Sequence, residues 1–312
     1  MRAHCAWTKT AGRRGGRRTI ALAAASLLIL TAAATAQEAT NVGALSGTLK
    51  KVKDSGTITL GYRESSLPFS YLNRRQQPIG YSLDLCREIV EDVSTELDGM
   101  EIKIAFAPVT PADRLQRVAS GEIDLECGST TNNPERRSQV AFSPIIFVAG
   151  TQLLVPKTSP IDSFKALAGK SVAVTAGTTN EQVVRRLAAT ERLRLEIRLT
   201  RDHDESLALL SSGKVDAFVT DGIILRGLTA THEAEFKLVG ELLSVEPYGL
   251  PYRLDDPYMT AAIDRTFARL ASAGRLKAYY DRWFMGPLPG GQALNLPMSP
   301  LLAETFRKLG QP

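Results

Sequence analysis

Three arginines lie in polar segments at the edges of the expected strands and helices: Arg63, Arg114 and Arg136. A guanidinium stays charged and binds a carboxylate through two parallel hydrogen bonds. Because one hydrogen bond to a charged group contributes roughly 1.5–3 kcal/mol net, a ligand with two carboxylates requires at least two such positions. For any one of these arginines taken alone, a solvated surface charge is the simpler interpretation.

Two turns rich in hydroxyl groups each follow an expected strand. Ser129 and Thr131 lie in the first turn, and Gly177, Thr178 and Thr179 form the second. Their hydroxyl and backbone N–H groups are suited to a small polar ligand, and the helix N-terminus after Gly177 is suited to a carboxylate. The two serine and threonine pairs are therefore candidate ligand-binding residues, although simple capping by Thr178 or Thr179 explains the second turn equally well.

His203 and Asp221 complete the set of candidate residues. His203 lies in a strand-to-helix loop, where a single histidine is commonly a cap or a surface residue. Asp221 follows an expected strand, and its carboxylate is suited either to a ligand ammonium or to a helix cap. No second histidine or cysteine stands at ligand spacing from His203, so we expect no metal site.

The sequence contains no catalytic motif. It has no Gly-x-Ser-x-Gly elbow, no His-Glu-x-x-His and no phosphate-binding loop. Glu64 and Glu126 are acids for which the sequence suggests no partner. We therefore expect a protein that is not an enzyme and that uses no cofactor.

The positive net charge is concentrated at the N-terminus. The 312 residues carry a formal charge of +5, but residues 1–36 contain six basic residues and no acid. The remaining chain has 32 basic and 33 acidic residues, a net charge of −1. This balance argues against nucleic acid or another polyanion as a partner.

Residues 1–36 have the pattern of a signal peptide. Arg13 to Arg18 precede an apolar run, Ile20 to Leu30, of about 11 residues, too short to span a hydrocarbon core of ~30 Å. Small residues at Ala34 and Ala36 then fit a cleavage site. We expect export from the cytoplasm; an uncleaved amphipathic anchor is the alternative.

Two cysteines, Cys86 and Cys127, remain after the leader. An oxidising compartment permits a disulfide between them, but spacing alone does not establish one. Two buried thiols that act as small hydrophobic side chains are the alternative.

Strands alternate with helices along the chain. Residues 57–62, 102–106 and 123–127 have strand patterns, residues 82–93 have apolar positions at helical spacing, and Thr110 with Pro111 and Asp113 has the pattern of a helix start. Such alternation favours an α/β fold with parallel strand pairing.

A weak internal repeat predicts two similar lobes. Residues 115–124 align with residues 207–216 as a helix end, a Ser-Gly stop and a strand entered through an aspartate. Residues 56–61 align with residues 169–174. We expect a two-lobed fold in which each lobe has a mixed sheet flanked by helices, and two extended segments, near 142–156 and 245–254, form the hinge.

These patterns give the expected domain boundaries. Residues 1–36 form the signal peptide, 37–147 the first part of lobe 1, 148–243 lobe 2, and 244–312 the return to lobe 1. A long helical stretch, Pro257 to Trp283, is expected to pack on lobe 1.

Several strings of residues resemble one protein family. Arg63-Glu-Ser-Ser-Leu-Pro-Phe-Ser-Tyr71, Glu126-Cys-Gly-Ser-Thr-Thr-Asn-Asn133 with Glu135-Arg136, and Asp202-His203 together resemble the periplasmic glutamate/aspartate-binding proteins, which belong to the polar-amino-acid solute-binding proteins of ABC importers. The likeness extends from about Leu49 to Trp283. It implies the type II periplasmic binding protein fold, an acidic amino acid as ligand, a membrane permease as partner and a monomeric state.

The resemblance also implies roles for the candidate residues. Arg136, with Ser129 and Thr131 beside it, matches the site of the ligand's α-carboxylate. Arg63 and Arg114 match the arginines for the side-chain carboxylate.

The second lobe supplies the other matches. The turn of Thr178 and Thr179 matches an anion turn, His203 matches a histidine that closes on the ligand, and Asp221 matches the acid for the α-ammonium. Pro111 departs from the pattern, because relatives carry a serine there, and this difference concerns fine specificity.

Two alternatives remain from the sequence. The same fold serves periplasmic dehydratases of aromatic-acid biosynthesis, and a binder of another ligand, such as glutamine or a small dicarboxylate, would share most of these features. The preference for glutamate or aspartate depends on the depth of the pocket, which the sequence does not contain.

Overall fold

The computed structural model describes residues 45–230 and 234–311. The expected signal peptide, residues 1–36, lies outside the described residues. In the part that the structure describes, no helix combines the length and apolar character needed to cross a membrane.

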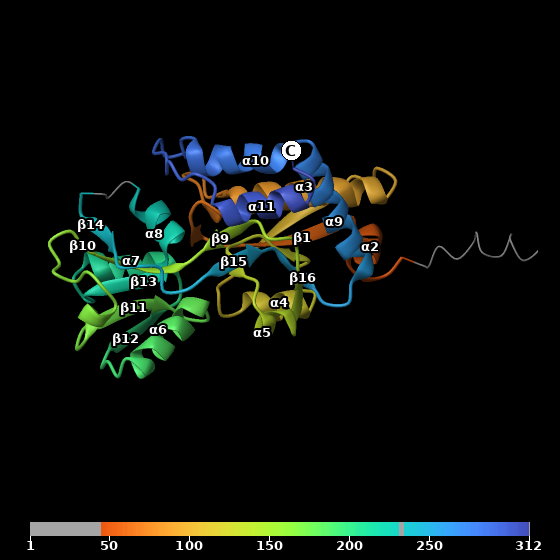
Figure 1. Cartoon of the computed structure of the whole chain (residues 1–312). Coiled ribbons are helices and arrows are strands. Elements are labelled where there is room, and N and C mark those ends of the chain that lie inside the picture. Colours follow the sequence, from red (N-terminus) through yellow and green to blue (C-terminus); the bar gives the residue numbers. More distant parts are fainter. Residues whose placement is uncertain (1–44, 231–233, 312) are drawn as a thin grey trace, which may run out of the picture. The chain divides into compact units, whose positions relative to one another are not determined.

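Lobe 1 is built on a five-stranded sheet with the order β5-β1-β6-β16-β8; β1 and β16 are labelled in Figure 1. The central strand β1 pairs in parallel with β5 and β6, whereas β16 pairs antiparallel with β6 and β8. The strands are β1 (Thr57–Tyr62), β5 (Lys103–Pro108), β6 (Leu125–Glu126), β8 (Val140–Phe142) and β16 (Pro251–Arg253). The sheet is mixed because β16, which comes from the C-terminal part of the chain, runs antiparallel to its neighbours.

Lobe 2 repeats this design with the order β12-β11-β13-β10-β14 (Figure 1). Here β11 pairs in parallel with β12 and β13, and β10 is antiparallel to β13 and β14. The strands are β10 (Thr151–Pro156), β11 (Ser171–Thr175), β12 (Glu196–Thr200), β13 (Ala217–Asp221) and β14 (Phe236–Val239). Two mixed sheets, one in each lobe, are the expected fold class.

The core of lobe 2 explains the continuous apolar runs of its strands. Val172 and Val174 pack in one cluster, while Ala173 packs in another cluster with Phe218. Successive side chains of a strand point to opposite faces, so both faces of this sheet are covered. The covering helices are η1 (Lys165–Leu167), α6 (Thr179–Thr190), α7 (His203–Ser211) and α8 (Gly222–Thr229).

A third sheet joins the lobes. Strand β15 (Glu246–Gly249) pairs antiparallel with β9 (Phe147–Ala149) and with β7 (Thr130–Thr131). Strand β9 leads into β10 of lobe 2, and β15 leads into β16 of lobe 1. These two extended segments form the hinge, and β7 brings one of the hydroxyl-rich turns against it.

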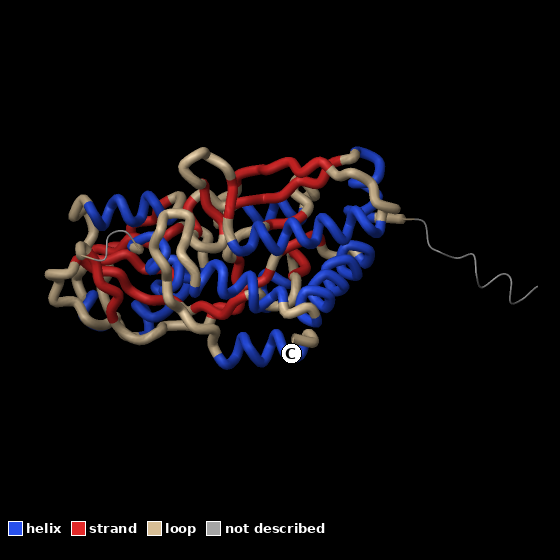
Figure 2. Tube along the Cα trace, turned by 90° about the horizontal axis from the view of Figure 1, so that it is seen from above, coloured by secondary structure: helices blue, strands red, loops and turns tan. Residues whose placement is uncertain are grey.

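Helices of lobe 1 come from distant parts of the sequence. Arg269 in α9 (Pro257–Ser272) forms ion pairs with Glu88 and Asp92 of α3 (Tyr81–Glu96). The other helices of this lobe are α2 (Gly47–Ser55), α4 (Arg114–Ala119), α5 (Pro134–Arg137) and α10 (Arg275–Tyr280). A three-stranded sheet of β2 (Ser65–Ser66), β3 (Ser70–Leu72) and β4 (Pro78–Ile79) precedes α3. The final helix α11 (Pro300–Lys308) lies along one edge in Figure 2.

The structure shifts several of the expected element boundaries. The regular helix predicted from Thr110 is assigned from Arg114 onward. Ahead of it, Thr110 caps the chain as predicted: its backbone N–H donates to Asp113 Oδ1 (2.7 Å), that of Asp113 donates to Thr110 Oγ1 (3.3 Å), and that of Arg114 donates to the Thr110 carbonyl (3.1 Å). The strand predicted for residues 123–127 is limited to Leu125–Glu126.

The expected helix from Pro257 to Trp283 is divided into three segments. Helix α9 ends at Ser272, because Gly274 has a φ of 68° that an α-helix does not continue through. Helix α10 follows, and Asp281–Met285 then forms a single π-helical turn, η2.

The internal repeat recurs at the level of single atoms. Asp124 Oδ2 accepts from the backbone N–H of Thr59 at 2.8 Å, and Asp216 Oδ2 accepts from that of Ser171, also at 2.8 Å. Each aspartate therefore joins the start of one strand to the neighbouring strand of its lobe. The strand alignment of the sequence analysis is displaced by one residue, because the register makes Leu60 equivalent to Val172 rather than to Ala173.

Candidate ligand-binding site

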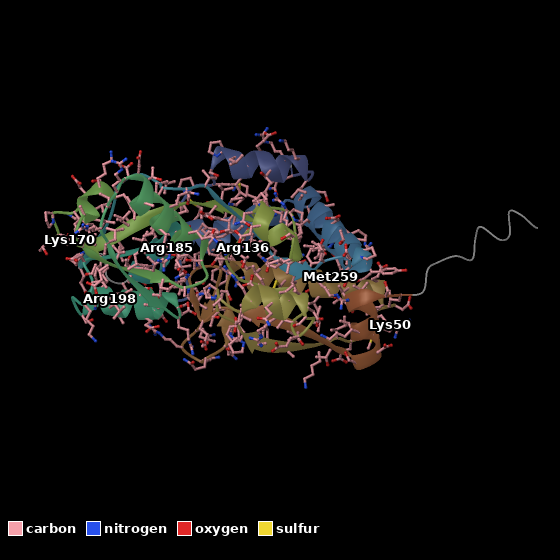
Figure 3. The ribbon with its side chains drawn as sticks, turned by 90° about the horizontal axis from the view of Figure 1, so that it is seen from below. Lys50, Arg136, Lys170, Arg185, Arg198 and Met259 are labelled. Carbon is pink, nitrogen blue, oxygen red and sulfur yellow. A yellow bond between two sulfur atoms is a disulfide. The ribbon has the colours of Figure 1, made fainter. Side chains whose placement is uncertain are left out.

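The three candidate arginines are buried in lobe 1. Arg63 follows β1, Arg114 is the first residue of α4, and Arg136 lies in α5; their exposed fractions are 1%, 2% and 7%. In Figure 3 Arg136 is labelled near the middle of the view, whereas Arg185 and Arg198 lie on lobe 2. A solvated surface charge, the simpler interpretation of each arginine alone, does not describe these three.

Arg63 is held by groups from both lobes. Its backbone N–H donates to Ser70 Oγ (2.8 Å), and its Nη2 donates to Asp202 Oδ1 of lobe 2 (2.5 Å). Ser65 Oγ donates to the same carboxylate oxygen at 2.6 Å. The Nε of Arg63 is buried and has no hydrogen-bond partner among the described residues. Arg63 therefore keeps one donor free for another acceptor.

Arg114 lies beside a buried glutamate. Its Nη1 is 3.9 Å from Glu126 Oε1 and donates a long hydrogen bond (3.5 Å) to the carbonyl of Ser129. Burial lowers the pKa of Arg114 to about 9, against the opposing effect of Glu126, so the group stays charged at neutral pH. Arg114 Nε and Glu126 Oε1 are buried without a hydrogen-bond partner in the described structure.

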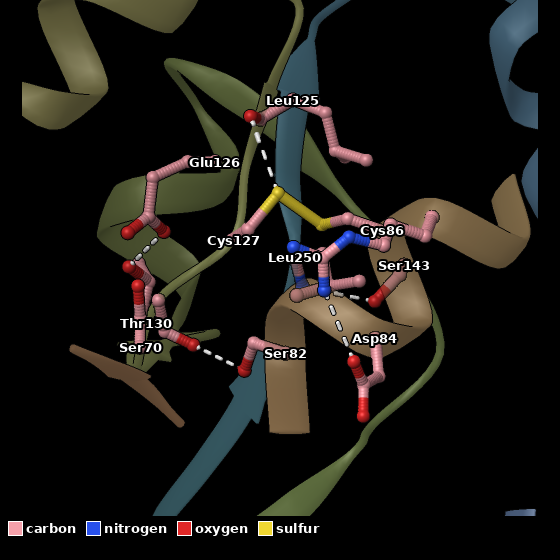
Figure 4. The surroundings of a disulfide bond; sticks show 12 residues. Ser70, Ser82, Asp84, Cys86, Leu125, Glu126, Cys127, Thr130, Ser143 and Leu250 are labelled. Atoms are coloured by element: carbon pink, nitrogen blue, oxygen red, sulfur yellow. Dashed lines mark hydrogen bonds and ion pairs between the residues drawn. A yellow bond between two sulfur atoms is a disulfide. The ribbon is translucent and has the colours of Figure 1, made fainter. Parts of the chain in front are cut away.

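A disulfide between Cys86 of α3 and Cys127 anchors the segment that carries these groups (Figure 4). Both residues are fully buried. Beside it, Thr130 Oγ1 donates to Glu126 Oε2 (2.6 Å) and Ser82 Oγ donates to the carbonyl of Gly128 (2.7 Å). The structure thus decides the open question of the cysteines in favour of pairing, and the disulfide lies two residues before Ser129.

Arg136 connects the first turn with the second. Its Nη1 donates to the carbonyl of Thr131 (3.1 Å) and its Nη2 to the carbonyl of Gly177 in lobe 2 (3.3 Å). Burial lowers its pKa, and Glu246, Glu126 and Asp221 oppose this shift. Carbonyls are neutral acceptors, so no carboxylate neutralises this guanidinium by direct contact among the described residues.

Beside Arg136, hydroxyl groups of the two lobes contact each other. Thr131 Oγ1 lies 3.3 Å from Thr179 Oγ1, which donates to Glu246 Oε2 at 2.8 Å. These three residues also line a cavity of about 430 Å³. Thr178 is the N-cap of α6 and accepts from the backbone N–H of Glu181 (3.2 Å), so the capping interpretation of this turn holds for Thr178.

Gly177 brings the second turn against lobe 1. Its φ is +75°, and a Cβ at this position would lie 2.7 Å from Ala112 Cα and 2.9 Å from the Ala112 nitrogen. From the sequence, the backbone N–H groups of this turn were expected at a ligand. In the structure the backbone at Gly177 approaches the backbone of the other lobe, which only a glycine permits at this distance.

His203 is buried (3%) rather than exposed, at the first position of α7. Its Nδ1 lies 2.9 Å from Thr175 Oγ1. Burial and the charge of Arg63 lower its pKa to about 3, against the effect of Asp202. The imidazole is therefore neutral at physiological pH and acts as a polar, uncharged group.

Asp221 is buried (6%) at the end of β13. Its Oδ1 accepts from Asn180 Nδ2 at 2.9 Å, and its Oδ2 accepts from the Tyr248 hydroxyl. Burial and the neighbouring Glu246 raise its pKa to about 6. Although Asp221 precedes α8, its side chain makes no capping hydrogen bond, so the helix-cap interpretation does not apply.

Residues 58–286 match the family described as bacterial extracellular solute-binding proteins, family 3. The chain belongs to this family. It is 42% identical over 269 residues to a protein of Pseudomonas aeruginosa named L-glutamate/L-aspartate-binding protein, across 85% of this chain and 88% of that protein. It is 37% identical over 289 residues to the glutamate/aspartate import solute-binding protein of Escherichia coli, across 92% of this chain and 95% of that one.

Solved structures of amino-acid-binding proteins share the fold of this solute-binding protein. One is an ancestral amino acid-binding protein described as a precursor of cyclohexadienyl dehydratase, with a TM-score of 0.66 and 28% identity, across 76% of this chain and 99% of that one. The two-lobed, type II fold expected from the sequence is therefore confirmed.

Sequence analysis missed several polar residues of the site in this solute-binding protein. Asp202 and Glu246 are buried acids, Tyr248 and Asn180 hold Asp221, and Glu126 has partners in Thr130 and Arg114. Glu126 was expected to be isolated, and its partners come from separate elements that only the fold brings together.

Glu64 was also expected to be isolated. It pairs with Arg201 of lobe 2 at 3.5 Å between Oε2 and Nη2; the Arg201 side chain is largely exposed and that of Glu64 is partly exposed. One signal was available in the sequence: Asp202 directly precedes a helix, where an aspartate is a preferred N-cap.

The site combines buried charges of both signs. Three buried guanidiniums face four buried carboxylates, and two guanidinium Nε atoms are free of hydrogen bonds within the described residues. Buried charges require partners, and the arrangement offers both signs to a bound zwitterion. The carboxylates belong to Glu126, Asp202, Asp221 and Glu246. Among the described residues no cluster of three or more histidines, cysteines and acids has the arrangement of a metal site.

Proposed function

We propose that this solute-binding protein captures an acidic amino acid, L-glutamate or L-aspartate, in the periplasm and presents it to the permease of an ABC importer. The observation that carries the proposal is the burial of three arginines with two unpartnered Nε atoms. The names of the relatives from Pseudomonas aeruginosa and Escherichia coli support the same ligand class.

We assign the α-carboxylate of the ligand to Arg136, with Ser129 and Thr131 beside it. The hydrogen bonds of Arg136 to the carbonyls of Thr131 and Gly177 support this assignment, because they orient the guanidinium without neutralising it. The α-ammonium is assigned to Asp221, a buried carboxylate at the carboxyl end of a strand.

We assign the side-chain carboxylate of the ligand to Arg63 and Arg114. Both guanidiniums are almost fully buried, where a carboxylate gains more from each charge-assisted bond than it does in water. The charge of Arg114 is destabilised by Arg136 and Arg63, and a bound carboxylate would relieve this repulsion. When lobe 2 closes over the ligand, it contributes Thr178, Thr179 and His203 to the site.

The energy required for binding is modest. A micromolar dissociation constant corresponds to about 8 kcal/mol, and hydrogen bonds to charged groups contribute roughly 1.5–3 kcal/mol each.

Calorimetry with four ligands tests the proposal. The purified protein is titrated with L-glutamate, L-aspartate, L-glutamine and L-arginine. We expect binding of the two acidic ligands and binding at least about tenfold weaker for glutamine, which lacks the second carboxylate. Equal affinity for glutamine and glutamate would refute the assignment of the side-chain carboxylate.

Arginine variants test the assignment residue by residue. Arg63→Ala is expected to weaken glutamate binding by ~100-fold or more, with a smaller effect on ligands without a side-chain carboxylate. Arg185→Ala is the control, because Arg185 is half-exposed and its ion pair within the described residues is with Glu181 of its own helix, at 3.0 Å. Unchanged glutamate binding in Arg63→Ala would contradict the assignment.

An enzyme of the dehydratase type is the second candidate function. The likeness to an ancestral precursor of cyclohexadienyl dehydratase favours it. We propose binding without turnover, since the relatives from Pseudomonas aeruginosa and Escherichia coli are named as solute-binding proteins. Incubation with prephenate and analysis of the products distinguishes the two: formation of phenylpyruvate would establish the enzyme.

We also propose that residues 1–36 are removed during export and that the mature protein is a monomer. N-terminal sequencing of the periplasmic fraction is expected to begin at Gln37, and light scattering is expected to give the mass of one chain. Retention of the leader in a membrane fraction would instead establish an anchor.

A further inference from the structure

The hinge strand β15 carries two buried side chains on one face. Glu246 and Tyr248 are two residues apart, so they point the same way from an extended strand. Both reach groups of lobe 2: Glu246 accepts from Thr179, and the Tyr248 hydroxyl donates to Asp221 Oδ2. The hinge therefore contacts the site directly.

The ring of Tyr248 is fixed by lobe 1 and the hinge. It contacts Phe69 edge to face, with ring centroids 5.1 Å apart, and Phe147 at 6.1 Å. Its backbone carbonyl accepts from the N–H of Ile146 at 2.9 Å, and the strand register places it opposite Thr131. Tyr248 is fully buried, so the position of its hydroxyl is set by these neighbours.

The hydroxyl is a permanent donor. Burial and the charge of Asp221 raise the pKa of Tyr248 well above its usual value, so the proton stays on the phenol oxygen. A protonated donor at Asp221 Oδ2, together with Asn180 at Oδ1, fixes the plane of the carboxylate. Each carboxylate oxygen retains a lone pair for a further donor.

We propose that Tyr248 is a positioning residue for the α-ammonium of the ligand: it holds Asp221 as an oriented, charged acceptor and ties that acceptor to the hinge. The inference rests on the proposed function and deepens it. Ammonium recognition then depends on the placement of the lobes, because the carboxylate belongs to lobe 2 and the ring that orients it is packed in lobe 1 and the hinge.

The charged groups around Asp221 set its response to pH. Glu246 from β15 raises its pKa, whereas Tyr248, Asn180 and Arg136 lower it. Removal of the phenol hydroxyl deletes one of the groups that favour the charged carboxylate. The pKa of Asp221 is therefore expected to rise above about 6 in a phenylalanine variant.

Tyr248→Phe tests the proposal, since phenylalanine keeps the ring and its packing. L-Glutamate is titrated calorimetrically between about pH 5 and pH 8. At neutral pH we expect affinity to fall by about tenfold or more, and we expect the midpoint of the pH dependence to move to higher pH. The matched control is Tyr81→Phe, which removes a buried hydroxyl bonded to the carbonyl of Ile146 (3.0 Å) in the same aromatic cluster.

The outcomes separate the inference from the proposed function. Wild-type protein that binds neither glutamate nor aspartate refutes the proposed function. If the wild type binds glutamate, two results overturn the inference. One is a Tyr248→Phe variant with the same glutamate affinity as the wild type; the other is an equal loss of affinity in Tyr248→Phe and Tyr81→Phe. In a double variant with Asp221→Asn, the tyrosine change is expected to add nothing further; full additivity would also overturn the role of Tyr248.

Discussion

The guanidinium of Arg63 forms a salt bridge with the carboxylate of Asp202, with 2.5 Å between Nη2 and Oδ1. The two residues are 139 positions apart in the sequence and belong to different lobes. Ser65 Oγ and the backbone N–H of His203 donate to the same oxygen, at 2.6 and 2.7 Å. This carboxylate therefore joins the first lobe to the N-terminus of a helix in the second.

Asp202→Asn tests the energetic importance of this salt bridge. Asparagine retains the helix cap but leaves Arg63 buried without its counter-charge, which typically costs about 3–5 kcal/mol. We expect a fall of this order in the free energy of unfolding of the ligand-free protein, measured with urea at neutral pH. Glu64→Gln is the control, because its pair with Arg201 is largely exposed, and its effect should be below about 1 kcal/mol.

The effect of Asp202→Asn should depend on pH. Burial raises the pKa of Asp202, but Arg63, His203 and the hydrogen bond from Ser65 lower it more, so the net shift is downward. A lowered folded-state pKa gives stability above the unfolded-state pKa that is lost as the pH falls through the folded-state value. The variant and the wild type should therefore converge in strong acid; a constant difference would contradict the salt bridge as its source.

Asp221→Asn should stabilise the ligand-free protein. The folded-state pKa of Asp221 is raised from 3.8 to about 6, so the folded state binds more protons than the unfolded state between these values, and stability falls as the pH rises through them. Removal of the charge should raise the free energy of unfolding by up to about 3 kcal/mol at neutral pH. Urea unfolding at several pH values measures this gain, which should vanish near pH 4. A destabilised variant at neutral pH would show that the carboxylate is satisfied without ligand.

Gly177→Ala should weaken ligand binding by separating the lobes. A Cβ there would meet Ala112 Cα at 2.7 Å and would also require a side chain at a φ of +75°. Gly213→Ala is a matched control, since its φ is +67° but nothing lies within 4 Å of its Cβ.

Both glycine variants should lose about 1 kcal/mol of stability through the backbone conformation. Only Gly177→Ala should also lose affinity for glutamate, by about tenfold or more, as measured by calorimetry. Equal affinity in the two variants would mean that the close approach at Ala112 is not needed for binding.

Reduction of the Cys86–Cys127 disulfide should lower stability without removing the fold. The two cysteines are 41 positions apart, and closure of such a loop contributes about 4 kcal/mol in the chain-entropy description. Urea unfolding with and without dithiothreitol measures the difference. For the double alanine variant, which has no disulfide, dithiothreitol should not change the unfolding curve. Coincident unfolding curves for the oxidised and reduced protein would exclude a stabilising role.

Much of the local structure was predictable because it depends on neighbours in the chain. The strand at residues 57–62 was predicted with the bounds that the structure gives, and the helix at 82–93 lies inside α3. The helix start at Thr110 was also predictable, because Thr110 and Asp113 exchange two capping hydrogen bonds within the local sequence, although the regular helix is assigned only from Arg114.

The candidate site was predictable in its residue types but not in its pairings. Arginines beside strand ends, and the strings of residues shared with a known family, were sufficient to select Arg63, Arg114 and Arg136. The sequence suggested no partner for Glu126, and it gave no role to Tyr248, because their contacts come from elements far apart in the chain.

The sequence by itself determined the two-lobed α/β fold and the residue types of the candidate site, because periodicity and motif strings are local features of the chain. Only the tertiary structure decided which charge faces which. Arg63 meets Asp202, and Tyr248 meets Asp221, across the boundary between the lobes. Such contacts depend on how the hinge strands return the chain to lobe 1, and no local pattern encodes the distance between two segments that only folding brings together.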